Sequence, residues 1–168
     1  AVTQLDCTHA LLLQGDEPLL LPAHIEAVVD AINGWPSGDA WNATAPINTP
    51  EELDRHSFVK YAIASDGRVL YGFRRSPAIS PFAVQQTYIR KVLGLIGYRK
   101  DYLLELASSP PSVVELHESI EQMRVIERGD HLVSVPVDKS LASINEPQEA
   151  EIVLEQLRDD PVQRALLD

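Results

Sequence analysis

The sequence has little of what disulfide-rich, zinc-binding and membrane proteins require. Its 168 residues include one cysteine, Cys7, which excludes a disulfide framework within the chain and a cysteine-based zinc site. No apolar run approaches the roughly 18 residues of a membrane-spanning helix, so we expect no membrane partner. Asp6 interrupts the first apolar stretch, which argues against a signal peptide and makes the cytoplasm the expected location.

Basic residues are also scarce. Lys and Arg number 14 and Asp and Glu number 25, which gives a formal net charge of −11. A surface that binds nucleic acid needs clustered Lys and Arg, so we expect no nucleic-acid partner. The phosphate-binding patterns G-x-x-x-x-G-K and G-x-G-x-x-G do not occur, and the five histidines are scattered without metal-ligand spacing.

The sequence does contain enough apolar residues, 45% of the total, for the core of a single domain over residues 1–168. Apolar periodicity, capping residues and turn residues divide the chain into strands and helices. We expect strands at 10–14, 41–47, 59–64, 69–73, 93–98 and 131–137, and helices at 22–33, from 49, at 101–107, 112–128 and 145–157. Because strands and helices alternate, the pattern favours a layered α/β fold.

A β-hairpin is expected where Asp66-Gly67 separates two apolar runs. Its apolar side chains are more than a small two-stranded arm can leave exposed to water. We therefore expect the chain to form a homodimer through the region 41–73.

The stretch 11–19 is the first candidate for a functional site, because an apolar run ends there in a polar cluster. Such a run is typical of a buried parallel strand, and ligands in open α/β sheets bind beyond the carboxyl ends of these strands. Gln14, Asp16 and Glu17 stand at that point. Asp16 suits Mg²⁺, which takes one or two carboxylates together with substrate phosphates. The alternative is that Asp16 and Glu17 only charge and cap the start of a helix.

Five blocks of sequence, in order along nearly the whole chain, resemble the 3-deoxy-manno-octulosonate cytidylyltransferases, or CMP-Kdo synthetases. The blocks are 14–18, 45–77, 91–99, 118–124 and 144–149. The first reads QGDEP, as in the family, and the fourth reads ESIEQMR, similar to the family's ESLEQLR. Five blocks in the family's order indicate homology more strongly than any one of them.

The resemblance implies a three-layer, doubly wound α/β fold. Its sheet would be mostly parallel, with a hairpin dimerisation arm, and the N-terminal nucleotide-binding part of the family would be missing. The implied reaction transfers CMP from CTP to a 3-deoxy acid sugar such as Kdo and releases pyrophosphate, in the biosynthesis of lipopolysaccharide. CTP, the acid sugar, Mg²⁺ and a second copy of the chain would be its partners.

The resemblance assigns four residues to the substrates. Gln14 would touch the sugar or the nucleotide. Arg75 would pair with the sugar carboxylate, because a planar guanidinium group suits a bidentate contact. Glu118 and Gln122 would hydrogen-bond sugar hydroxyls, and residues four apart share one face of a helix. From the residues alone, Arg75 is more typical of a surface ion pair, and Glu118 and Gln122 are more typical of a solvated helix face.

The metal site and the phosphate-binding loop depart from the family. Asp16 would be catalytic and would bind Mg²⁺, but Asn145 stands where the family has its second metal-binding Asp. An amide oxygen binds Mg²⁺ without neutralising it, so we expect weaker metal binding. Val92 replaces a site His, and Arg74 replaces the Ser before the family's Arg. The family's glycine-rich, basic loop for the CTP phosphates has no counterpart in the sequence.

Two functions follow from these similarities and departures. In the first, the chain is the C-terminal two-thirds of a sugar-acid cytidylyltransferase, an incomplete fragment that is inactive alone. In the second, it is a degenerate, non-catalytic homologue that keeps the sugar pocket or the dimer arm as a binding module.

Overall fold

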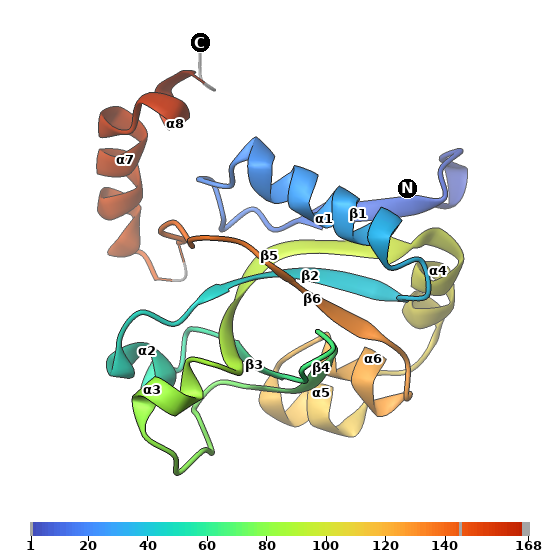
Figure 1. The fold of residues 1–168 in the computed structure, drawn as a ribbon. Helices are drawn as coiled ribbons and strands as arrows, with labels where there is room; N and C mark the ends of the chain where they lie inside the picture. The colour runs from blue at the N-terminus through green and yellow to red at the C-terminus, as the bar shows by residue number, and fades with distance from the viewer. Residues whose placement is uncertain (1, 145, 166–168) are drawn as a thin grey trace.

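The computed structural model describes residues 2–144 and 146–165, and within them six strands form one sheet. The strands are β1 (His9–Leu13), β2 (Ala40–Pro46), β3 (Lys60–Ile63), β4 (Val69–Phe73), β5 (Ile89–Arg99) and β6 (Leu132–Pro136). The helices are α1 (Pro22–Gly34), α2 (Pro50–Asp54), α3 (Phe82–Gln85), α4 (Lys100–Ser108), α5 (Val113–Glu118), α6 (Met123–Glu127), α7 (Glu149–Asp159) and α8 (Pro161–Ala165), preceded by a 3₁₀ turn, η1 (Val2–Gln4) (Figure 1).

The sheet is mixed, with the strand order β4-β3-β5-β2-β6 and with β1 paired to β5. Among the described strands β2 and β6 run parallel, and every other pair is antiparallel. The prediction of a mostly parallel sheet is therefore wrong. The family resemblance implied it, and the apolar run before Gln14 agreed with it, but such runs report burial on both faces of a strand and carry no information about its direction.

The long strand β5 has three partners. β2 runs along one edge of it, from the pair Ala40↔Tyr98 to the pair Pro46↔Arg90. The other edge is divided between β1, which lies opposite residues 95–99, and β3, which lies opposite residues 89–91. Between these two partners, residues 92–94 of β5 face no described strand on this edge. The candidate site lies at this gap in the strand pairing.

Helices cover both faces of the sheet, which confirms the expected three layers (Figure 1). The buried side chains between α1 and one face include Val28, Ile32, Trp41, Leu95 and Val135. Those between the other face and helices α4 and α6 include Ile96, Tyr98, Tyr102, Leu106 and Val125. Each large apolar side chain that is removed from water contributes about 1.5–3 kcal/mol to stability.

β1 lies at the predicted position but not in the predicted environment. It has β5 as its partner on one edge, and Leu12 and Leu13 are 45% and 47% exposed. The expectation of a buried parallel strand at 10–14 is thus corrected to a half-exposed antiparallel one. The glycines of β5 allow close packing of the backbone. A Cβ on Gly97 would lie 3.0 Å from Ile32 of α1, so a larger residue there would push the helix away.

The predicted hairpin forms, with β3 and β4 joined through Gly67 at φ +87°. It belongs to the main sheet, because β3 pairs with β5 and the Gly67 carbonyl accepts the Ser134 N–H at 2.9 Å. Val69 and Phe73 are buried within the chain itself. The apolar surface from which a dimer was predicted is therefore smaller than the sequence suggested, and the dimer stays a prediction.

Two predicted helices differ in the structure. The helix expected at 112–128 begins with the predicted capping box, in which Glu115 accepts the Ser112 N–H at 2.9 Å. It then breaks at Ser119, whose φ of 54° is left-handed, into α5 and α6. Glu118 and Gln122 consequently do not share one helix face. The last helix begins at Glu149 rather than at 145, and Asn145 lies outside the described residues.

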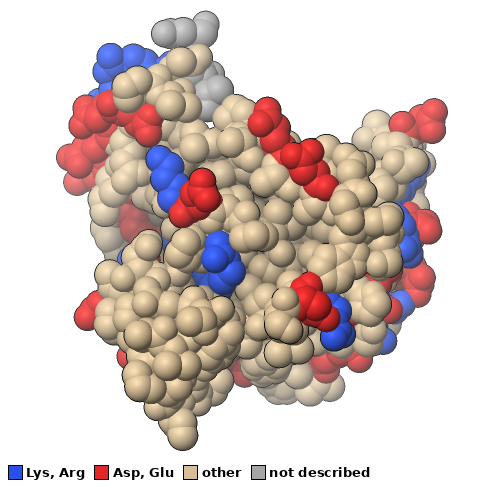
Figure 2. Space-filling view, viewed as in Figure 1, with Lys and Arg blue, Asp and Glu red and all other residues tan. Residues whose placement is uncertain are grey.

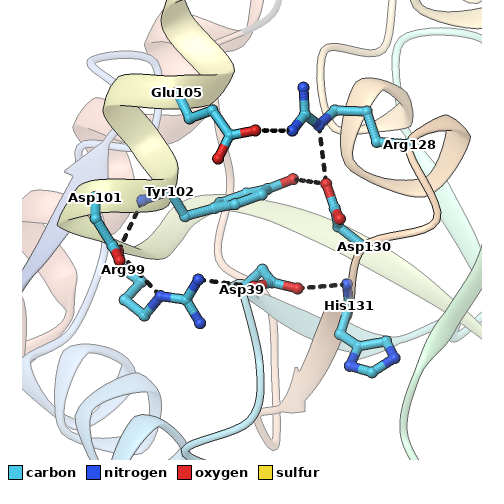
Figure 3. Close-up of polar contacts among 8 residues, drawn as sticks. All are labelled: Asp39, Arg99, Asp101, Tyr102, Glu105, Arg128, Asp130 and His131. Carbon is cyan, nitrogen blue, oxygen red and sulfur yellow. Dashed lines mark hydrogen bonds and ion pairs between the residues drawn. The ribbon is translucent and has the colours of Figure 1, made fainter.

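A network of charged and polar groups lies where β2 and β6 begin and β5 ends (Figure 3). Its members are Asp39, Arg99, Asp101, Tyr102, Glu105, Arg128, Asp130 and His131. Arg99 pairs with Asp39 at 3.2 Å, and the Tyr102 hydroxyl donates to Asp130 at 2.9 Å. This amino-end network ties α4 to the residues that precede β2 and β6.

The surface of the described residues is mostly uncharged on the face in Figure 2, with acidic side chains gathered over α7. Basic side chains on that face are scattered among acidic and uncharged ones. None of the helices within residues 2–144 and 146–165 is both long enough and apolar enough to span a membrane.

Candidate functional site

A polar cavity of about 340 Å³ lies beyond the carboxyl end of β1, where β5 exchanges one partner for another. On the β1 side the Gln14 N–H donates to the Gly94 carbonyl at 2.8 Å, and on the β3 side the Val92 N–H donates to the Val59 carbonyl at 2.9 Å. The lining residues are at 14, 16–17, 57–59, 74, 91–94, 119–122 and 143. The cavity therefore lies where β5 changes from one antiparallel partner to the other.

A bulge brings the backbone of β5 to this cavity. β2 and β5 shift register between Asn42 and Thr44, which leaves carbonyls of β5 outside the regular ladder. The buried Asn42 amide donates to two of them, Leu93 at 2.8 Å and Leu95 at 3.0 Å. Its own oxygen accepts the Tyr61 hydroxyl at 2.8 Å. The bulge is thus held by satisfied hydrogen bonds, which makes it a fixed part of the site.

Gly94 lets the loop after β1 pack directly on this bulge. A Cβ at Gly94 would lie 2.7 Å from the Gln14 side-chain oxygen and 2.9 Å from Cγ of Glu17, closer than real contacts allow. A Glu17 carboxylate oxygen accepts the Gly94 N–H at 2.9 Å. Burial raises the pKa of Glu17, against the opposing effects of this hydrogen bond and the charge of Lys91. Glu17 is therefore built into the wall of the cavity.

Asp16 has a free carboxylate. It is exposed, and its side chain makes no hydrogen bond or ion pair within residues 2–144 and 146–165. Its backbone carbonyl accepts the Ile144 N–H at 2.8 Å, which draws the segment after β6 to the cavity. A carboxylate of this kind fits a hard cation that takes its other ligands from substrate phosphates and water. The described residues themselves hold no cluster of three or more His, Cys, Asp and Glu for a metal.

Two basic side chains line the cavity. Lys91 is buried, with Nζ 3.8 Å from the centroid of the Phe58 ring. Burial lowers its pKa, against the opposing charge of Glu17. The Arg74 guanidinium donates to backbone carbonyls only, those of His56 at 3.1 Å, Glu118 at 3.1 Å and Ser119 at 2.9 Å. Both cations therefore stand at the cavity beside the loop that carries Asp16.

A third cation, Lys60, fixes the wall from behind. Its side chain is fully buried, and Nζ donates to the carbonyls of Arg55 at 2.7 Å, Phe58 at 2.9 Å and Arg74. These carbonyls belong to the chain before β3 and the chain after β4. One ammonium group thus holds together the two segments that deliver Phe58 and Arg74 to the cavity.

Three of the six predicted site residues meet at this cavity: Gln14, Asp16 and Gln122. Gln122 is 7% exposed, and its side-chain amide has no partner within the described residues. Arg75 is exposed and does not line the cavity, and Glu118 is placed beside it only through its backbone carbonyl. Asn145, two residues beyond the lining residue Ser143, lies outside the described residues.

Sequence reasoning did not assign Arg74 or Lys91. Arg74 was set aside because it stands where the family has a Ser, and only the fold reveals which of two adjacent arginines reaches the cavity. Lys91 did carry a signal, since a lysine within an apolar strand pattern must find a partner when it is buried.

Comparison with known proteins is decisive about the family. The sequence profile of one family, Cytidylyltransferase, matches residues 2–139. The chain belongs to the cytidylyltransferase family. Its curated relatives include the 3-deoxy-manno-octulosonate cytidylyltransferases of Chlorobium phaeobacteroides (strain DSM 266), 34% identical over 157 residues, and Geobacter sulfurreducens, 31% identical over 157 residues. These alignments cover 90% and 87% of this chain and 62% of each relative, so the chain spans about three fifths of their length.

Solved structures agree on the fold of this chain. The structure of CMP:2-keto-3-deoxy-manno-octonic acid synthetase complexed with CTP matches with a TM-score of 0.83 at 24% identity, over 95% of this chain and 65% of that one. The inositol-1-phosphate CTP transferase from T. maritima matches with a TM-score of 0.58 at 11% identity, over 94% and 58%. At these identities the likeness establishes the mixed α/β architecture and nothing about the substrate.

Proposed function

We propose that this chain is part of an enzyme that transfers CMP from CTP to the anomeric hydroxyl of a 3-deoxy acid sugar such as Kdo, for cell-surface polysaccharide biosynthesis, and that the 168-residue chain is inactive alone. One observation carries the proposal. Two motifs far apart in the sequence, QGDEP at 14–18 and ESIEQMR at 118–124, deliver Gln14, Asp16 and Gln122 to one cavity. The relatives at 31–34% identity are named for this reaction, which supports the choice of sugar acid.

The residues at the cavity suit the two halves of that reaction. In the transfer, the sugar hydroxyl oxygen bonds to the α-phosphorus of CTP, the hydroxyl gives up its proton, and pyrophosphate leaves. The amides of Gln14 and Gln122 can donate to and accept from sugar hydroxyls, which orients the attacking oxygen. Asp16 would hold Mg²⁺, which when bound neutralises phosphate charge and lowers the pKa of the hydroxyl.

The second candidate is a module that binds the sugar without transferring CMP. The lining of the cavity favours it in one respect, since Arg74 and Lys91 are its basic side chains among the described residues. A site for phosphoryl transfer needs several cationic or backbone donors around the phosphates. The chain also spans 62% of the length of the relative from Chlorobium phaeobacteroides.

Calorimetry with Kdo, and separately a pyrophosphate-release assay with CTP, Kdo and Mg²⁺, test the proposal on the 168-residue chain. We expect Kdo to bind, and we expect no pyrophosphate release by the chain alone. Gln122→Leu should weaken Kdo binding, whereas Glu118→Gln, at the motif position outside the cavity, should leave it unchanged. Failure of the unsubstituted chain to bind Kdo would refute the sugar assignment, and turnover of CTP would refute the module.

We also propose a homodimer, formed through the exposed side of the hairpin. Leu70 and Tyr71 of β4 are 55% and 38% exposed, next to the buried Val69. Light scattering at tens of micromolar should show a dimer, a range chosen for weak interfaces. A strict monomer at that concentration, or a dimer undisturbed by Leu70→Asp, would contradict this.

A further inference from the structure

The two adjacent arginines after β4 differ in every property that decides ligand binding. Arg74 lines the cavity and is half-buried, whereas Arg75 is exposed and lies outside it. The Arg74 carbonyl accepts a hydrogen bond from the buried Lys60, which fixes the backbone from which its side chain extends. A guanidinium held in place by its own backbone and by three carbonyl acceptors loses little freedom when a ligand arrives.

The hydrogen-bond inventory of Arg74 leaves room for one bidentate ligand. A guanidinium carries five N–H donors, one on Nε and two on each Nη. The carbonyls of Glu118, His56 and Ser119 take one donor each from Nε, Nη1 and Nη2. One N–H therefore remains on each Nη. Two donors on adjacent nitrogens match the two oxygens of a carboxylate.

Arg74 also forms no ion pair within the described residues, although the lining of the cavity includes the carboxylates of Asp16, Glu17 and Glu121. No carboxylate within residues 2–144 and 146–165 pairs with it, and its acceptors are neutral carbonyls. Arg124, by contrast, pairs with Glu115 close by in the same layer of helices. A cation without a counter-ion at the wall of a cavity attracts an anionic ligand, because burial strengthens the interaction relative to water.

We propose that Arg74, and not Arg75, binds the carboxylate of the acid sugar. This rests on the proposed function, and it deepens that function by naming the residue that separates acid sugars from neutral ones. It replaces the assignment of Arg75 that the sequence motif implies. Arg74 acts here by direct contact with the substrate, through its two remaining N–H groups.

The test compares both arginines with two ligands. Calorimetry is run on the unsubstituted chain, Arg74→Gln, Arg74→Lys and Arg75→Gln, each with Kdo and with the Kdo methyl ester, which lacks the negative charge. We expect Arg74→Gln to weaken Kdo binding about ten-fold to a hundred-fold and to abolish the preference for Kdo over its ester. The affinity of Arg74→Lys for Kdo should lie between those of the unsubstituted chain and Arg74→Gln, because lysine keeps the charge but cannot make the bidentate contact. Arg75→Gln should change neither ligand by more than about two-fold.

Each other outcome has a definite meaning. Loss of the preference in Arg75→Gln with retention in Arg74→Gln would overturn the inference in favour of Arg75. If the unsubstituted chain binds no Kdo, the sugar assignment fails, and the same variants are tested with a nine-carbon 2-keto sugar acid and with pyrophosphate. Binding of the nine-carbon acid that depends on Arg74 would then uphold the inference alone, whereas binding of pyrophosphate only, or of neither anion, would refute it. Thermal melts of every variant identify a loss of binding that comes from unfolding. Arg74→Lys, which keeps the positive charge, is the variant to use if Arg74→Gln does not fold.

Discussion

The two ends of the sheet balance positive charge in opposite ways. In the amino-end network, Arg99 and Arg128 each contact two carboxylates, so their charges are compensated within the chain (Figure 3). At the cavity, Lys60 and Arg74 donate to neutral carbonyls. Compensated arginines have no charge left for a ligand and serve packing. Of the two carbonyl-bound cations, Lys60 is buried behind the cavity wall, whereas Arg74 lines the cavity and keeps its charge for the ligand that we propose there.

The largest loss of stability is expected from replacing Lys60, whose ammonium group donates to backbone carbonyls at the wall of the cavity. Lys60→Met leaves one buried and two partly buried carbonyls without this donor, and we expect a loss of about 3 kcal/mol in the free energy of unfolding. Lys139→Met, at an exposed lysine, is the control. Urea denaturation measures both. Equal stability of the two variants would show that the Lys60 contacts do not hold the cavity wall.

The same variant gives a pH test. Burial lowers the pKa of Lys60 to about 8, whereas an unfolded lysine titrates near 10.4. Between these values the unfolded chain binds more protons than the folded one, so the Lys60 contribution to stability rises with pH across this window. Below pH 8 both states are protonated, and that contribution is constant. We expect the stability difference between the unsubstituted chain and Lys60→Met to grow from pH 8 to pH 10. A difference that stays constant would contradict the lowered pKa.

Gly94→Ala should close the cavity while leaving the amino-end network intact. The added Cβ would meet Gln14 at 2.7 Å and Glu17 at 2.9 Å, so the loop after β1 must move. Overpacking of this kind costs about 1–3 kcal/mol. We expect calorimetry to show loss of sugar binding. Gly15→Ala, where a Cβ would have nothing within 4 Å, is the matched control and should bind normally.

Much of the fold follows from local sequence signals. The capping boxes Thr49–Glu52 and Ser112–Glu115 and the Asp66-Gly67 turn form as predicted, because a few neighbouring residues determine each of them. Strand direction could not be predicted, since it depends on which strands meet. The break at Ser119 carried no signal either, because a left-handed serine is rare and is imposed by its surroundings.

The site was predictable only in part, for a related reason. Gln14 and Asp16 follow a strand end, so their place is set by the position of that strand. Arg74 and Arg75 are neighbours in the bend that follows β4, where no strand or helix periodicity sets the direction of a side chain, so a motif cannot decide which one faces the cavity. The helical spacing rule wrongly placed Glu118 and Gln122 on one face, because α5 ends at Glu118 and α6 begins only at Met123.

A sequence-based prediction concerns charge at the metal position. Asn145→Asp adds one negative charge near the ion predicted at Asp16, and opposite unit charges about 4 Å apart attract by roughly 4 kcal/mol at an effective dielectric near 20. A third of this gives about a tenfold gain in Mg²⁺ affinity. Calorimetry with Mg²⁺ or Mn²⁺, with and without CTP, measures it, and Asp16→Asn should abolish the gain. Equal affinities would leave Asn145 as a helix cap, a role that Asp fills as well.

The smallest effects are expected in the amino-end network. Tyr102→Phe removes the hydroxyl that donates to Asp130 at 2.9 Å, and we expect a loss of about 1 kcal/mol. Tyr71→Phe, at an exposed tyrosine, should cost nothing measurable. Arg128→Gln should lower the melting temperature slightly, and 1 M NaCl should remove most of that difference, because salt screens exposed pairs over about 3 Å.

The Lys60 contacts, which are buried and have neutral acceptors, should not respond to salt in this way. The salt dependence of Arg128→Gln, compared with that of Lys60→Met, therefore measures how differently the two ends of the sheet are stabilised. If Tyr102→Phe cost more than Lys60→Met, the compensated end would be the one that holds the fold together. The carbonyl-bound cations would then be free to move with a ligand, and the case for a preformed anion site at Arg74 would weaken.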